Sequence, residues 1–112
     1  MNRIEPELSK LQRISDPNFL MREIVDLLDT SFPPESGKYY TFRYRAKTPN
    51  IAYDRHPLVE VVDVFNWGFR GVNYHWGEPR QYTWDEILGQ IYEVTEEEFI
   101  TLQSLPFQAL NN

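Results

Sequence analysis

The sequence predicts a mixed α+β fold in which N-terminal helices pack on a small, strongly bent antiparallel β-barrel that is followed by a short C-terminal helix. Residues 5–32 repeat apolar side chains at helical spacing, and residues 38–76 hold three strand-like runs rich in aromatic and β-branched side chains. A chain of 112 residues has the length of a single domain. We divide it into a helical segment (1–34), a barrel (38–94) and a final helix (95–105).

The N-terminal segment is expected to hold two helices separated by a kink. The first is short, with apolar residues three positions apart. The sequence Ser15-Asp16-Pro17 then marks a new start, because a side chain that can cap a helix precedes a proline at the first helical position. The second helix is expected from Pro17 to Thr30, and Pro33 and Pro34 end it. Its apolar stripe consists of Phe19, Leu20, Ile24, Leu27 and Leu28.

Residues 39–46 alternate as in a strand with one buried face. The core face is expected to carry Tyr40, Phe42, Tyr44 and Ala46. The exposed face is expected to carry Tyr39, Thr41, Arg43 and Arg45. After a loop at residues 47–56, a second strand is expected at 58–65, partly buried on both faces because nearly all its side chains are β-branched or aromatic.

A hairpin turn at Asn66-Trp67-Gly68 leads into a third strand, residues 69–76. Gly71 inside this strand indicates a bulge or a sharp bend, as the corner of a small barrel requires. A short fourth strand is expected at residues 80–82, and residues 90–94 are expected to close the sheet.

Two capping boxes predict helix starts in the C-terminal part of the chain. Thr83 and Glu86 have the required spacing, which predicts a helix of one or two turns between the late strands. Thr95 and Glu98 have the same spacing, before a helix expected to run to about residue 104. The acidic residues after Thr95 also suit the positive end of a helix dipole.

The net charge of −6 is unevenly distributed along the chain. Residues 1–37 carry −3, residues 38–80 carry +3, and residues 81–112 carry −6 with no basic residue among them. An acidic chain disfavours general nucleic-acid binding. The pattern fits either an ordinary surface of mixed sign or a dipolar module with a basic face and an acidic tail.

Residues that could carry chemistry are few. The absence of cysteine excludes disulfides and thiolate metal ligands. The two histidines, His56 and His75, have no further ligands at the spacing of a metal site, and no serine lies in a nucleophile elbow. We therefore expect no enzyme, no cofactor and no metal. We also expect no signal peptide and no membrane helix, because no apolar stretch has the required length.

A basic and aromatic strand face is a candidate nucleic-acid site. Alternation places Tyr39, Arg43 and Arg45 on one face, with Lys47 in the loop beyond, and Arg70 adds a further basic group. Barrel proteins hold single strands by stacking bases on aromatic rings and by contacting phosphates. The alternative, which we favour, is a solvated face whose long side chains cover the barrel.

Two features are candidate protein-contact surfaces. Trp67 lies at a predicted hairpin tip, where an exposed aromatic residue can anchor an interface, although it could instead fold back onto Phe65 or Phe69. The stripe of the second helix must be buried either on an open end of the barrel or on another subunit. In the second case the contact residues would be Phe19, Leu20, Ile24 and Leu27.

Three segments together resemble small proteins of large-genome tailed bacteriophages, in particular T4-like phages and cyanophages. They are residues 40–48 (YTFRYRAKT), 53–59 (YDRHPLV) and 68–76 (GFRGVNYHW). The resemblance covers about a third of the chain. It implies an SH3-like barrel and a structural role without enzymatic activity, and it names no partner. The turn at Trp67 and residues 80–84 are more aromatic than in that group, and the N-terminal helices are not part of the pattern.

We therefore expect a non-enzymatic bacteriophage protein that acts by protein–protein contact, as a minor virion component or an assembly factor. Its partners would be other virion proteins or a second copy of the chain, and its location the virion or the cytoplasm of the infected host. One alternative is a barrel that contacts nucleic acid and handles DNA ends or the genome. Another is an early phage protein that binds host machinery through its acidic tail.

Overall fold

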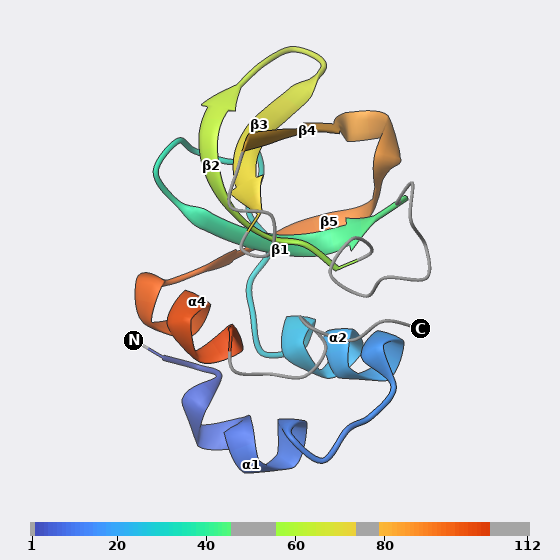
Figure 1. The fold of residues 1–112 in the computed structure, drawn as a ribbon, viewed down its shortest axis with the longest axis vertical. Helices are drawn as coiled ribbons and strands as arrows, with labels where there is room; N and C mark the ends of the chain where they lie inside the picture. The colour runs from blue at the N-terminus through green and yellow to red at the C-terminus, as the bar shows by residue number, and fades with distance from the viewer. Residues whose placement is uncertain (1, 46–55, 74–78, 104–112) are drawn as a thin grey trace.

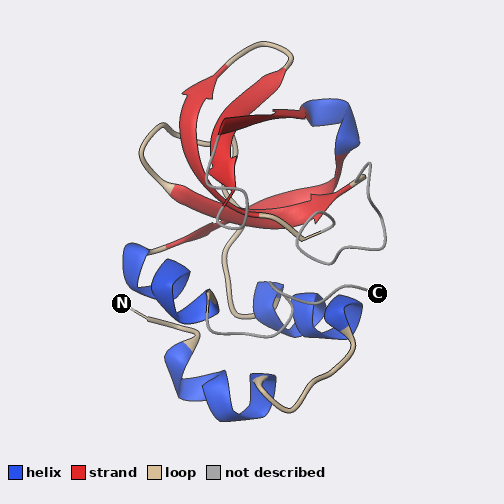
Figure 2. Cartoon of the chain, in the orientation of Figure 1, coloured by secondary structure: helices blue, strands red, loops and turns tan. Residues whose placement is uncertain are grey.

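The computed structural model describes residues 2–45, 56–73 and 79–103 of the chain. One curled antiparallel sheet forms the upper half of the molecule in Figure 1. The helices, apart from the short turn Trp84–Glu86 within the sheet region, lie together on its outer side (Figure 2). The helical elements are η1 (Glu5–Glu7), α1 (Leu8–Leu11), α2 (Pro17–Val25), η2 (Trp84–Glu86) and α4 (Glu96–Leu102). The strands are β1 (Tyr39–Tyr44), β2 (Leu58–Val64), β3 (Gly68–Asn73), β4 (Pro79–Thr83) and β5 (Ile87–Val94). The fold is mixed α+β.

The helices begin where the sequence places their start signals. Asp16 caps α2 and accepts a hydrogen bond from the amide of Asn18 at 3.3 Å, and Pro17 takes the first helical position. The helix ends at Val25, before the predicted boundary at Thr30. Among the described residues, no helix has both the length and the apolar character needed to span a membrane.

The predicted closed barrel of SH3-like type is wrong. The sheet order is β4-β3-β2-β1-β5, so that β4 and β5 are its two edges. No ladder joins these two edges within the described part of the chain; they are connected only through η2. The molecule is therefore an open five-stranded sheet that curls over itself.

Between the end of β1 and the end of β4, side-chain contacts take the place of the backbone pairing that would close a barrel. The Tyr44 hydroxyl donates to Oε1 of Glu86 at 2.8 Å and accepts from the amide of Thr83 at 3.4 Å. Thr83 makes no capping bond to the backbone, so the predicted capping box there is wrong; its hydroxyl donates to Glu86 Oε1 instead. The expected helix is a single 3₁₀ turn, and β5 begins directly after it at Ile87.

The curl of the sheet comes in part from an irregularity between β2 and β3. β2 carries one extra residue, Val62, where it passes Gly71 of β3. A Cβ atom at Gly71 would overlap the side chain of Val59 and lie 2.8 Å from the carbonyl oxygen of Glu60. The sequence places the irregularity correctly near Gly71, but the bulged residue belongs to the neighbouring strand.

Both faces of β1 are buried, and they face two different cores. The inner core, inside the curl, consists of Tyr40, Phe42, Val59, Val61, Phe69, Tyr82 and Ile91. The outer core, between sheet and helices, consists of Ile4, Leu11, Leu20, Met21, Ile24, Leu28, Leu58, Val94 and Leu102. Tyr40 and Phe42 are therefore core residues as predicted, whereas Ala46 lies outside the described residues.

The prediction that the other face of β1 is exposed is wrong for its first half. Thr41 is buried and donates to the carbonyl oxygen of Pro57 at 3.0 Å. Tyr39 packs against Phe99 of α4, with ring centroids 4.5 Å apart. The reason is that α2 and α4 cover this face, and only its far end at Arg43 reaches solvent.

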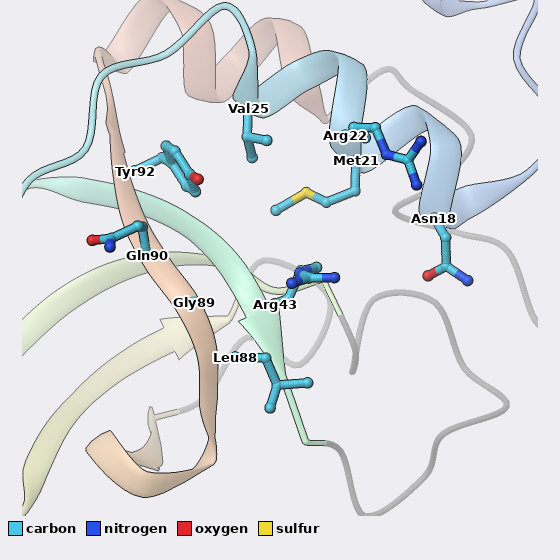
Figure 3. A pocket seen from close by; sticks show the side chains of 9 residues that line it. All are labelled: Asn18, Met21, Arg22, Val25, Arg43, Leu88, Gly89, Gln90 and Tyr92. Atoms are coloured by element: carbon cyan, nitrogen blue, oxygen red, sulfur yellow. The ribbon is translucent and has the colours of Figure 1, made fainter.

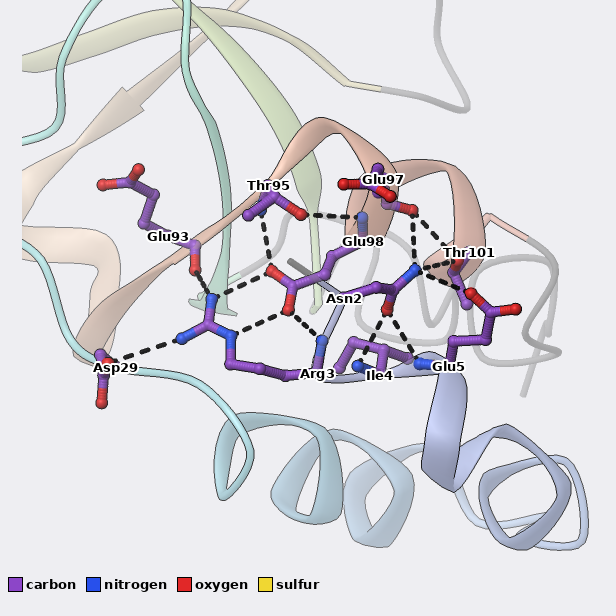
Figure 4. A network of polar contacts seen from close by, with 10 residues as sticks. All are labelled: Asn2, Arg3, Ile4, Glu5, Asp29, Glu93, Thr95, Glu97, Glu98 and Thr101. Carbon is purple, nitrogen blue, oxygen red and sulfur yellow. Dashed lines mark hydrogen bonds and ion pairs between the residues drawn. The ribbon is translucent and has the colours of Figure 1, made fainter.

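The start of α4 confirms the second predicted capping box. Thr95 Oγ1 accepts from the amide of Glu98 at 3.1 Å, and Glu98 Oε1 accepts from the amide of Thr95 at 2.8 Å. The same carboxylate also binds Arg3, whose backbone amide and Nε donate to Oε2 at 2.7 and 2.8 Å and whose Nη2 donates to Oε1 at 3.0 Å (Figure 4). This network joins the N-terminal segment to α4.

Candidate functional site

A pocket of about 320 Å³ opens between α2 and the strands β1 and β5 (Figure 3). That volume is at the lower end of the range found for small-molecule sites, roughly 300–1,000 Å³. The helix contributes Asn18, Met21, Arg22 and Val25. The strands contribute Arg43, Leu88, Gly89, Gln90 and Tyr92. The pocket is thus built from segments that are distant in the sequence.

Gly89 shapes the strand wall of the pocket. Its φ of +93° is a conformation that glycine adopts without strain and other residues rarely adopt. A Cβ atom at this position would lie 3.8 Å from Nη2 of Arg43, so the guanidinium of Arg43 lies beside the bare backbone of β5. Arg22 extends from the helix wall on the other side, as Figure 3 shows.

The two arginines make the pocket locally positive within an acidic protein. No aspartate or glutamate is among its lining residues. The ion pairs between described residues involve Arg3, Lys10, Lys38 and Arg70, and neither Arg22 nor Arg43 belongs to one. Both guanidinium groups therefore keep donors for a bound anion.

Asn18 adds an oriented amide at one side of the pocket. Its Oδ1 accepts from Nε2 of His56, a buried residue, at 2.9 Å. Because the amide oxygen is engaged with this histidine, the amide nitrogen remains as a donor. His56 thus has a positioning role in the structure. Within the described residues, no group of three or more ligating side chains lies close enough together to hold a metal ion.

A second surface stands at the tip of the β2–β3 hairpin. The rings of Phe65 and Trp67 stack with centroids 5.0 Å apart and an interplanar angle of 6°. They remain 39% and 43% exposed, respectively. Trp67 therefore does fold back onto Phe65, one of the two alternatives considered from sequence, and yet the pair stays accessible. We call these two residues the hairpin aromatic pair.

The residues of the predicted nucleic-acid face do not form one surface. Tyr39 packs on Phe99, and its hydroxyl donates to Glu96 Oε2 at 3.3 Å. Arg70 is paired with Asp63 at 2.8 Å on β3 and β2. Arg43 lies in the pocket described above, Arg45 is exposed beyond the end of β1, and Lys47 lies outside the described residues.

The residues of the predicted helix contact are mostly inside the molecule. Leu20 and Ile24 are fully buried in the outer core, and Leu27 packs against it. Phe19 alone among the four is largely exposed, at 45%. The helix stripe therefore covers the chain's own sheet, and in this structure it leaves little of α2 for another subunit.

The tyrosines beside the inner core show no sign of activation as acids or bases. Burial, followed by the hydrogen bond to Glu86, raises the pKa of Tyr44 above its ordinary value. Burial likewise raises the pKa of Tyr40, whose hydroxyl oxygen accepts a hydrogen bond from the backbone amide of Glu35 at 2.8 Å. Both phenols stay protonated at neutral pH, which suits structural hydrogen bonding. His75, the other histidine considered from sequence, lies outside the described residues.

Comparison of the chain with protein-family models, with curated proteins and with solved structures found no match. The proposed resemblance to bacteriophage proteins and the locations inferred from it therefore stay predictions.

Sequence reasoning missed the pocket as a site. Arg22, Leu88 and Gly89 were not singled out, because no pattern in the sequence shows that α2 lies beside β5. The one available signal was Gly89 itself, an isolated glycine between apolar and polar strand residues, which indicates a bent or closely approached backbone.

Proposed function

We propose that the protein is a non-enzymatic binding protein that acts by protein–protein contact through the hairpin aromatic pair. The observation that supports this most directly is the parallel stack of Phe65 on Trp67, two large rings that remain well exposed at the end of a hairpin. Exposed aromatic residues of this size cost free energy in water and are enriched at interface hot spots. The pair is preorganised, because stacking fixes both rings before any partner binds.

The backbone below the pair is rigid enough to present it. Phe65 and Gly68 exchange backbone hydrogen bonds at 2.7 and 3.4 Å, which closes a two-residue loop. Trp84, the first residue of η2, supports the loop: its indole nitrogen donates to the carbonyl oxygen of Asn66 at 2.8 Å, and its backbone amide donates to the carbonyl oxygen of Trp67 at 3.1 Å. A partner with an apolar recess would thus meet a fixed, protruding surface.

The alternatives considered from sequence have less support in the geometry. A nucleic-acid face would need Tyr39 and Arg70 to be available, and both have partners within the chain. A docking surface made of the acidic tail would use residues that are partly engaged: Glu98 binds Arg3, Glu93 lies 3.7 Å from Lys38, and Glu86 binds Tyr44. The hairpin, in contrast, combines exposure with two large apolar rings that are fixed against each other.

The proposal predicts that removing both rings abolishes partner capture. The purified full chain and the variant Phe65→Ser/Trp67→Ser would be immobilised and exposed to extract from the cells in which the protein occurs, and retained proteins would be identified and purified. Loss of two hot-spot aromatics is expected to weaken binding of that purified partner by about 30-fold or more, as measured by calorimetry. Sedimentation velocity of the free chain tests whether the partner is a second copy.

The matched control is Ile100→Ser, which removes a more exposed apolar side chain from α4, on the helical side of the molecule. It should bind as the unmodified chain does. The proposal fails if the hairpin variant binds the partner unchanged, or if the unmodified chain captures no protein and stays monomeric at micromolar concentration.

A further inference from the structure

The arginine pocket between α2 and β5 has features that the hairpin contact does not explain. It places Arg22 and Arg43 at one cavity without an acidic neighbour among the lining residues. Two cations that share a small concave site repel each other, and an anion between them relieves that repulsion. The chain as a whole has a net charge of −6, so a positively charged pocket is opposite in sign to the rest of the protein and points to a specific anionic ligand.

The walls around the arginines are apolar. Met21 is buried at the base of the pocket, Val25 and Tyr92 are half-buried, and Leu88 is partly exposed at the strand side (Figure 3). Inorganic phosphate has only polar oxygen atoms on its surface. It would therefore leave these apolar walls in contact with water. A ligand that places an apolar group against them and an anionic group at the arginines would use both kinds of surface.

We propose that this pocket binds an organic carboxylate with a small apolar body. The guanidinium fork matches the two oxygens of a carboxylate, and the amide nitrogen of Asn18 can supply a further donor. The volume of about 320 Å³ suits a single small acid or the last residue of a peptide with a free C-terminus. Both sources present the same chemistry, a carboxylate next to an aliphatic or aromatic group.

Gly89 fits this assignment. Its lack of a side chain leaves the guanidinium of Arg43 beside open backbone, at the place where a larger residue would occupy the pocket. The φ of +93° also favours glycine there. At Gly89, β5 thus leaves the guanidinium of Arg43 open to the cavity instead of covering it with a side chain.

The test is a titration of the isotope-labelled full chain with hexanoate, followed by nitrogen–proton NMR. The amide signals of Leu88, Gly89 and Gln90 are expected to shift with a dissociation constant of about 1–10 mM, as for a ligand with few atoms. Hexanamide, which has the same body without the charge, and inorganic phosphate, which has the charge without the body, should each bind at least about tenfold more weakly. Leucine-ended peptides with a free or an amidated C-terminus form the second arm.

Three variants locate the site. Arg43→Gln and Arg22→Gln should each lower the affinity for hexanoate by about tenfold. Arg13→Gln, which alters an exposed arginine outside the pocket, should leave the affinity unchanged. Thermal unfolding of each variant checks that the fold is retained. If hexanoate binds, the ligand's carboxylate belongs to a free small acid. If only the peptide with a free C-terminus binds, the carboxylate belongs to a chain end. Either result supports the proposal.

The proposal is overturned if neither probe shifts the three amides at up to about 50 mM, a concentration well above the expected constant. It is also overturned if phosphate or hexanamide binds as well as hexanoate does, or if both arginine variants bind unchanged. These results are independent of the hairpin contact, because Phe65 and Trp67 do not line this pocket.

Discussion

Replacing Arg3 by alanine is expected to lower the free energy of unfolding by about 3 kcal/mol, because it leaves a buried carboxylate without its cation. The Glu98 side chain is 0% exposed, and Arg3 Nε lies 2.8 Å from its Oε2. The backbone amides of residue 3 and of Thr95 would still bond to the carboxylate, which keeps the loss at the lower end for a broken buried pair. Urea unfolding of both proteins at neutral pH measures the difference.

A surface ion pair provides the matched comparison. Lys10 and Glu23 are 3.3 Å apart, but the Lys10 side chain is 65% exposed. Lys10→Ala should therefore cost less than about 1 kcal/mol. Glu98→Gln keeps the spacing of the capping box and loses the charge, and in a double-mutant cycle with Arg3→Ala the two should couple by about 1–3 kcal/mol. Equal losses for Arg3→Ala and Lys10→Ala would show that the buried pair is not special.

Acid should destabilise the protein through the same carboxylate. Burial alone would raise the pKa of Glu98, but the hydrogen bonds from Arg3 and Thr95 outweigh it and lower this pKa to about 2. The unfolded chain has an ordinary value of about 4.3, so between these values it binds more protons than the folded chain. Stability is therefore full above about pH 5 and falls as the pH decreases towards 2.

The size of this acid loss is on the order of 2 kcal/mol, after allowance for solvent around Arg3, whose side chain is 25% exposed. Unfolding curves recorded at several pH values between 2 and 6 measure it. Arg3→Ala should flatten the profile, because the folded-state pKa then moves back towards its ordinary value. A variant whose profile runs parallel to that of the unmodified chain would contradict this assignment.

Signals that act within a single turn were readable from the sequence. Asp16 before Pro17 starts α2, and Thr95 with Glu98 starts α4, because each cap joins atoms only two or three residues apart. The alternation of β1 was readable for the same reason, since it needs only the geometry of one strand. These features do not depend on what lies across the molecule.

Burial of the second face of β1 depends on a neighbour that the sequence does not show. Tyr39 and Thr41 alternate with core residues, and alternation is typical of a strand with one solvated side. Here Phe99 of α4 and Met21 of α2 lie against that side. The apolar stripe of α2 required a partner surface, but periodicity alone could not decide between this sheet and another subunit.

Barrel closure and the arginine pocket also depend on distant contacts. The bend near Gly71 was predicted, but a bend does not determine whether the outer strands pair. Where the outer strands approach each other, the hydroxyl of Tyr44 accepts a hydrogen bond from the amide of Thr83, a residue far from it in the chain. Likewise Arg22 and Arg43 come together only because α2 crosses β1 and β5, which no spacing rule predicts.

Replacing Phe42 by alanine is expected to lower the free energy of unfolding by about 4 kcal/mol, a large part of the roughly 5–15 kcal/mol of an ordinary domain. Phe42 is fully buried at the centre of the inner core. Its ring makes edge contacts with Phe69 and Tyr82, with centroids 5.6 and 5.4 Å away. Alanine would leave a cavity and remove both aromatic contacts. Phe19→Ala, the same change at a ring that is 45% exposed on α2, should cost less than about 1 kcal/mol.

Hydrogen exchange can show whether these rings also hold the open sheet in its curl. Phe42, Phe69 and Tyr82 belong to β1, β3 and β4, so their contacts connect one edge of the sheet to its middle. Among the described strands β4 pairs with β3 alone, so no second ladder there keeps it in place. In Phe42→Ala the amides of β4 should therefore lose more protection than those shared by β1 and β5. Uniform loss across all strands would mean that the curl is maintained by the backbone ladders alone.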